Sequence, residues 1–209
     1  YKAVKNIKNS LPEEIPLIGF SGSPWTLAAY SIEGRSSKDF KKTLNFLVTN
    51  QKDVHNLLTK YTDACFLYLR RQVQSGADVI QIFDSWANLH TKEGLIEYSF
   101  NYINALISAL KLDPVTKNIP VIIFARNPKC NIEELINTSA DCISLFWSMN
   151  DLNFELAKNK VAIQGNLDPK ILLENDEIIK RETYKILEKF ERYPGYIFNL
   201  GHGITPDIN

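Results

Sequence analysis

The chain has 209 residues, of which 44% are hydrophobic and 23% are charged, the composition of one globular domain with a substantial core. Lys plus Arg and Asp plus Glu both number 24, so the net charge indicates neither nucleic acid nor an anionic membrane as a partner. The three cysteines are widely spaced and fit a reducing cytoplasm rather than a disulfide framework, and no apolar run is long enough to cross a bilayer.

Six short apolar runs have the length and composition of buried parallel strands. In chain order, they are Pro16–Phe20, Asp78–Phe83, Pro120–Phe124, Cys142–Phe146, Val161–Gln164 and Tyr196–Leu200. Segments with helical spacing lie between them, at Pro24–Ile32, Lys41–Gln74, Gly94–Leu112, Ile132–Ser139, Leu152–Lys158 and Asp176–Arg192. Strand and helix alternate without a linker, which predicts one α/β domain over residues 1–209.

Such alternation builds either an open doubly wound sheet or a closed barrel of eight strands. The turn after the first strand, Ser21–Pro24, lacks the glycine spacing of a dinucleotide-binding fold. Polar or glycine-bearing turns follow nearly every strand, as in a barrel whose loops share one site. Because an eight-stranded barrel takes about 250 residues, we expect an incomplete (β/α)8 TIM-type barrel with about six of its eight βα units. The chain begins with Tyr1 rather than Met, in agreement with a start partway through the fold.

Polar side chains at the predicted strand ends are candidate site residues, since these ends converge on one face of a barrel. His202 stands between two glycines, where its imidazole can face a ligand as a donor or acid/base. Asp84 and Ser85 close the second strand: the aspartate fits a helix cap as well as a functional role, and the serine is predicted to contact a ligand. Tyr30 lies on the short second helix, where its hydroxyl can reach over the barrel mouth or its ring can pack. No motif of closely spaced His, Cys or carboxylates predicts a metal site.

Five blocks of sequence resemble a known family when they are taken in chain order. They are Pro16–Leu27 with Tyr30 and Glu33-Gly34, Gly76–Ala87, Ile122–Arg126, Gln164–Pro169, and Asn199–Ile204 with Pro206. Their residues and their order resemble the uroporphyrinogen decarboxylase family over the whole chain. Five ordered blocks make the resemblance specific.

The resemblance implies a (β/α)8 barrel, usually a homodimer, that removes the four acetate carboxyl groups of uroporphyrinogen III to give coproporphyrinogen III in haem synthesis. It implies a small tetrapyrrole substrate and no cofactor, metal, nucleic acid or membrane partner. A protonated pyrrole ring of the substrate withdraws electrons as carbon dioxide leaves. The resemblance also implies that Tyr30, Ser85 and His202 bind the substrate by hydrogen-bonding its carboxylates or by shaping the pocket.

Some family features have no counterpart in this sequence. The reactive arginines and the aspartate that binds the pyrrole N–H groups are expected ahead of Tyr1, and a terminal helix is expected after Asn209. We therefore expect these 209 residues alone to be inactive. Phe146 stands where the family generally has Asp, Asn88 where it has Gly, and Asn127-Pro128 in place of a glycine-rich turn.

These departures leave two alternatives to the decarboxylase. A non-catalytic or degenerate barrel of the same family is the first, for which the reasons are Phe146 and the missing terminal parts of the barrel. A corrinoid or thiol methyltransferase of the same superfamily ranks lower. It would carry His-x-Cys and a distant cysteine, and none of the three histidines is followed by such a cysteine.

Overall fold

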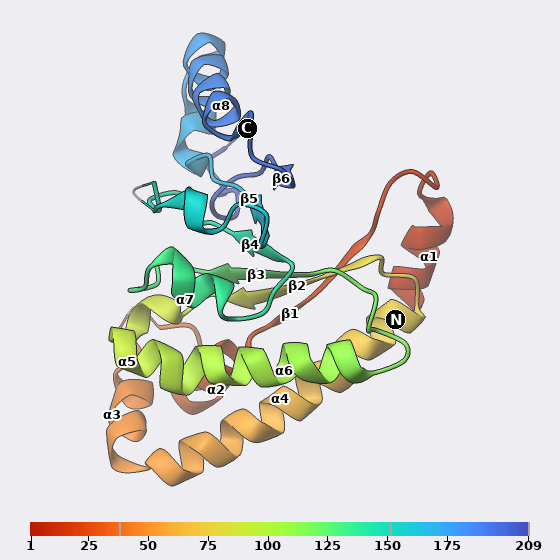
Figure 1. Ribbon diagram of the computed structural model, residues 1–209. Helices are drawn as coiled ribbons and strands as arrows, with labels where there is room; N and C mark the ends of the chain where they lie inside the picture. The colour runs from red at the N-terminus through yellow and green to blue at the C-terminus, as the bar shows by residue number, and fades with distance from the viewer. Residues whose placement is uncertain (38, 151, 209) are drawn as a thin grey trace.

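The computed structural model describes residues 1–37, 39–150 and 152–208. Within these residues, six parallel strands form one sheet in which every strand lies beside its neighbours in sequence (Figure 1). The strands are β1 (Ile18–Gly22), β2 (Val79–Asp84), β3 (Val121–Ala125), β4 (Cys142–Ser144), β5 (Ala162–Gln164) and β6 (Tyr196–Ile197). All six apolar runs predicted as strands are confirmed, with ends displaced by a few residues.

The order of the strands decides between the two predicted architectures. A doubly wound sheet reverses its strand order at a switch point, whereas the order here runs from β1 to β6 without reversal. The sheet therefore consists of six consecutive units of a (β/α)8 barrel. The outer edges of β1 and β6 have no strand partner among the described residues.

Helices cover the outer face of this sheet. Figure 1 shows α4 and α6 side by side along β1 to β3, and α8 beside β5 and β6. The α-helices are α1 (Lys2–Ser10), α2 (Pro24–Glu33), α3 (Lys41–Thr49), α4 (Gln51–Gln74), α5 (Lys92–Leu95), α6 (Asn101–Leu112), α7 (Ile132–Ile136) and α8 (Asp176–Phe190). Shorter turns are the 3₁₀ helices η1 (Ala87–Leu89), η3 (Phe154–Leu156) and η4 (Pro169–Leu173), and the π-helical turn η2 (Ile96–Phe100).

The structure corrects the predicted helices in three places. The helix predicted over Lys41–Gln74 is two helices, because Asn50 leaves the helical region at φ −136° and ψ 43°. The helix predicted over Leu152–Lys158 is only the 3₁₀ turn η3. Helix α1 was not predicted: Ala3, Val4 and Ile7 recur at helical spacing along its nine residues, although none of its side chains is buried.

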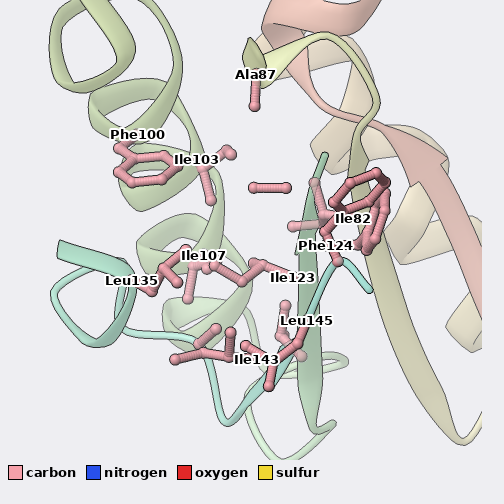
Figure 2. Close-up of a cluster of buried hydrophobic side chains, with 14 of the residues drawn as sticks. Ile82, Ala87, Phe100, Ile103, Ile107, Ile123, Phe124, Leu135, Ile143 and Leu145 are labelled. Carbon is pink, nitrogen blue, oxygen red and sulfur yellow. The ribbon is translucent and has the colours of Figure 1, made fainter. Parts of the chain in front are cut away.

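Alternation along the strands separates two sides of the sheet. Ile82, Ile123 and Ile143 face the helices and belong to the main hydrophobic core. Figure 2 shows Ile123 on the side of β3 that faces Ile107 of α6, with Phe124 on the opposite side. The strands therefore keep one apolar face for the core and turn the other toward the barrel interior. None of the described helices is both long and apolar enough to cross a membrane.

Candidate functional site

A cavity of about 360 Å³ opens on the inner face of the sheet, toward the carboxyl ends of the strands. Strands β2, β3 and β4 and the segment after β6 supply its walls. The lining residues are Gln81, Phe83, Ser85, Phe124, Ser144, Asn199, Leu200, His202, Gly203 and Ile204. Two of the three residues predicted to bind substrate, Ser85 and His202, thus line one cavity although they are far apart in sequence.

The period of two residues in a strand explains which side chains reach the cavity. Gln81, Phe83 and Ser85 are alternate residues along the end of β2, and all three line the cavity. Phe124 is the register partner of Phe83 on β3, and Ser144 is the partner of Phe124 on β4, so one inward row crosses three strands. The sequence interpretation did not identify this row. The alternation of a strand could have found part of it, because Phe83 and Gln81 lie two and four residues before Ser85 and so share its face.

Phenylalanine rings form a continuous series along this inner face. The ring centroids of Phe20 and Phe83 are 5.9 Å apart, and those of Phe83 and Phe124 are also 5.9 Å apart. Phe124 and Phe146 follow at 6.5 Å. Each ring comes from a different one of four adjacent strands or strand ends. The series presents an extended apolar surface on the inner face of the sheet.

His202 lies at the end of this aromatic series. The rings of Phe124 and Phe146 stand edgewise to its imidazole, with centroids 6.1 Å and 5.9 Å away. The preceding Gly201 is sterically required, because a Cβ atom there would lie 2.4 Å from the backbone nitrogen of Trp147. Close approach of the Gly201 backbone to Trp147 therefore brings His202 to the cavity.

Tyr30 lies outside the lining of the cavity. Its ring is 37% exposed on α2 and contacts Phe40 and the edge of Trp86, with centroids 6.1 Å and 5.9 Å away. Trp86 directly follows Ser85, and the guanidinium carbon of Arg126 lies 5.4 Å from its ring centroid. Tyr30 and Arg126 thus both contact the residue next to Ser85.

Asp84 points away from the cavity and is fully buried between the strand and the helices. Its carboxylate accepts hydrogen bonds from Ser23, Thr26 and Ser99 and from the backbone N–H of Trp86. Burial raises the pKa of this carboxyl to about 6, although the hydroxyl groups of Ser99, Ser23 and Thr26 act in the opposite direction. The sequence interpretation left Asp84 between a cap and a functional role and did not identify this network, because its side-chain partners come from two segments far apart in sequence, the start of α2 and η2.

The charges near the cavity are few. The residues that line it include neither a carboxylate nor a lysine or arginine. In the described parts of the chain, no three His, Cys, Asp or Glu side chains gather in an arrangement that could hold a metal ion. Burial raises the pKa of Cys65 to about 11 and those of Cys130 and Cys142 to about 12, so these thiols are poor nucleophiles and ligands.

Comparison with known proteins agrees with the motifs and with the fold. The family model for uroporphyrinogen decarboxylase (URO-D) matches residues 1–209. The chain belongs to the uroporphyrinogen decarboxylase family. Curated uroporphyrinogen decarboxylases of Ruthia magnifica and Pseudomonas fluorescens are each 41% identical over 209 residues, covering 99% of this chain and 60% and 59% of the relative. The chain thus spans about three-fifths of the length of the curated relatives that it matches.

A solved structure shares the fold at low sequence identity. A B12-independent methionine synthase from Shewanella superposes with a TM-score of 0.65 at 16% identity, over 98% of this chain and 60% of that protein. At this identity the likeness concerns the fold alone.

Two residues that depart from the expected family pattern, Asn127 and Phe146, lie at strand ends. Asn127, where the sequence resemblance led us to expect a glycine-rich turn, adopts a left-handed conformation with φ 41°, which asparagine tolerates better than most residues. Phe146, where the sequence resemblance led us to expect an aspartate, is 7% exposed, and its ring lies beside the imidazole of His202. The ring of Phe146 thus gives the imidazole of His202 an apolar neighbour.

Proposed function

We propose that the protein containing this chain catalyses the cofactor-independent decarboxylation of the four acetate side chains of uroporphyrinogen III, giving coproporphyrinogen III. The observation that carries the proposal is one cavity at the strand ends that combines a series of aromatic rings with the hydrogen-bonding groups of Ser85 and His202. Membership of the uroporphyrinogen decarboxylase family supports the same reaction.

In the proposed reaction, a pyrrole ring of the substrate is protonated and takes up the electron pair of the breaking carbon–carbon bond as carbon dioxide leaves. The remaining carbon is then protonated to a methyl group. Ser85 and His202 donate hydrogen bonds to substrate carboxylates and fix the orientation of the macrocycle. Phe83 and Phe124 cover its apolar faces and exclude water. Tyr30 is proposed to bind a carboxylate at the rim.

The proton-transfer groups are proposed to lie in the remaining part of the relatives' length, about two-fifths, which this chain does not span. The absence of cationic side chains from the cavity lining supports this division. On this proposal, the residues described here position the substrate, and arginines and an aspartate from the remaining two barrel units complete the site.

Anaerobic incubation of the purified full-length protein that contains this chain with uroporphyrinogen III tests the proposal. The products are oxidised to porphyrins and separated by their number of carboxyl groups. We expect porphyrins with successively fewer carboxyl groups, ending at coproporphyrin, and slower turnover by His202→Ala. His55→Ala is the matched control, because His55 lies on α4 beside Tyr102 and Glu97 and does not line the cavity. If uroporphyrin is recovered unchanged from the wild-type reaction, the proposal fails.

A barrel of the same family that binds a tetrapyrrole without converting it is the second candidate. Phe146 favours it, because an aromatic ring packs against His202 where the family generally has a carboxylate. Saturable binding of uroporphyrin, measured by quenching of tryptophan fluorescence, combined with no loss of carboxyl groups, would distinguish this function from the decarboxylase.

We further propose that residues 1–209 form a single partial barrel domain and that the whole protein acts as a homodimer in the cytoplasm, without a nucleic-acid or membrane partner. Three free thiols and a balance of 24 basic and 24 acidic residues support these assignments. Light scattering coupled to size-exclusion chromatography tests the dimer: the expected mass is twice that of the polypeptide.

A further inference from the structure

A buried carboxylate lies directly behind the cavity, on the helix-facing side of β2. Asp84 is 0% exposed and is the last residue of the strand, between Phe83 and Ser85, both of which line the cavity. Its side-chain hydrogen-bond partners belong to the start of α2 and to η2, while Asp84 itself ends β2. One side chain therefore joins three segments behind the site.

The directions of the hydrogen bonds follow from the backbone groups nearby. The Thr26 hydroxyl accepts a hydrogen bond of 2.9 Å from the Ser85 backbone N–H, so its own proton is directed to Asp84 Oδ1 at 3.2 Å. The Ser23 hydroxyl accepts from the Thr26 backbone N–H at 3.0 Å and directs its proton to the same oxygen at 3.1 Å. Ser99 donates to Oδ2, and the backbone N–H of Trp86 also hydrogen-bonds the carboxylate. These donors together match the acceptor capacity of an ionised carboxylate.

The same contacts connect the segments that carry two candidate substrate-binding residues, Ser85 and Tyr30. Thr26 joins Asp84 to the backbone of Ser85. Ser23 caps α2, which carries Tyr30, and its backbone N–H donates to the carbonyl of Phe83 at 2.8 Å. The start of α2 and the end of β2 are therefore fastened to each other through Asp84.

The ionised carboxylate of Asp84 lowers the stability of the folded protein, and this supports a functional role for it. Burial raises its pKa to about 6, so at neutral pH the folded protein keeps a buried group ionised against its desolvation. A neutral side chain of the same size avoids that desolvation. Groups retained at a cost to stability are typical of functional sites.

We propose that Asp84 is a positioning residue of the substrate site: through Thr26 it holds the end of β2 at Ser85, and through Ser23 it holds the start of the helix that carries Tyr30. The proposal deepens the proposed function and rests on it for the identity of the ligand. Asp84 itself does not touch the ligand, since its side chain points away from the cavity.

The test compares Asp84→Asn with the wild-type protein and with Asp113→Asn. The asparagine has the same shape but places an N–H₂ group among donors, which breaks the network without creating a void. Asp113→Asn makes the same chemical change at the end of α6, where Asp113 pairs with Arg70 and does not line the cavity. Kinetics with uroporphyrinogen, amide hydrogen exchange at Ser85 and uroporphyrin binding are measured for all three proteins.

We expect Asp84→Asn to weaken uroporphyrin binding and to reduce kcat/KM by about tenfold, the loss of roughly one to two hydrogen bonds. Exchange at the Ser85 amide is expected to accelerate about tenfold, whereas exchange at Ile123 in the neighbouring strand stays unchanged. In a Ser85→Ala background, the effect of Asp84→Asn on kcat/KM is expected to shrink, because the side chain that it positions is gone. Asp113→Asn is expected to leave kcat/KM unchanged.

Equal kcat/KM and equal Ser85 exchange in Asp84→Asn and wild type would overturn the positioning role. So would an undiminished effect in the Ser85→Ala background, since this indicates a general loss of structure. If the wild-type protein converts no uroporphyrinogen, the proposed function fails separately. Ser85 exchange and uroporphyrin affinity then still decide whether Asp84 positions the site, and unchanged values of both would refute it.

Discussion

The stability of the protein should depend on pH through Asp84. Its pKa is raised from 3.8 to about 6 in the folded state, so between these values the folded protein holds a proton that the unfolded chain has released. The contribution of this group to stability is therefore fully present below about pH 3.8 and is lost as the pH rises through 6. Its hydrogen-bond partners in the described structure are uncharged hydroxyl and N–H groups, so the titration belongs to Asp84 itself.

The magnitude follows from the shift of about two pKa units. At 1.36 kcal/mol for each unit, ionised Asp84 costs about 3 kcal/mol in the folded state at neutral pH, of which about 2.5 kcal/mol develops between pH 4 and 7.5. Asp84→Asn removes this titration. The free energy of unfolding of the wild-type protein, measured against that of Asp84→Asn by urea denaturation, should fall by about 2.5 kcal/mol over this range.

Asp113 provides a control, because its contribution to the free energy of unfolding should change with pH in the opposite direction. Partial desolvation raises the pKa of Asp113, but Arg70 and the backbone N–H groups of Val115 and Thr116 outweigh it and hold the pKa below 3.8. Ionised Asp113 stabilises the folded protein above that pH, and this stabilisation is lost as the pH falls. The free energy of unfolding of wild type should therefore increasingly exceed that of Asp113→Asn as the pH rises from 3 to 5. Parallel unfolding curves for wild type and Asp84→Asn from pH 4 to 7.5 would refute the reasoning about the buried carboxylate.

Three further changes test the core and the His202 side of the cavity. Ile123→Ala removes a side chain that is 1% exposed in the main core and should reduce the free energy of unfolding by about 3 kcal/mol in urea denaturation. Gly201→Ala forces a Cβ atom against the Trp147 backbone, so the His202 segment must move; we expect a lower Tm and roughly tenfold weaker uroporphyrin binding. Phe146→Leu keeps an apolar side chain but removes the ring beside His202. It should weaken uroporphyrin binding by about fivefold with an unchanged circular dichroism spectrum, and unchanged affinity would show that the ring does not orient the imidazole.

Local signals in the sequence were sufficient for the strands and for the family. Runs such as Val79–Asp84 are apolar and β-branched because both faces of a parallel strand are covered, and that composition marks them without any partner. The prediction of a single helix over Lys41–Gln74 was wrong, because helical spacing of apolar residues continues through Asn50. Only the backbone geometry at Asn50 divides the segment into two helices. Helix α1 was missed although Ala3, Val4 and Ile7 recur at helical spacing, because the segment is short and its other residues are mostly lysine and asparagine.

The sequence by itself determined that Asp84 and Ser85 end a buried strand, but only the tertiary structure decided what each residue does. Adjacent residues in a strand point to opposite faces, so Ser85 lines the cavity and Asp84 faces the helices. Which face becomes the cavity depends on how the sheet curves and which helices cover it. The partners of Asp84 and the pairing of Ser85 with His202 come from segments far apart in sequence, and folding alone brings those segments together.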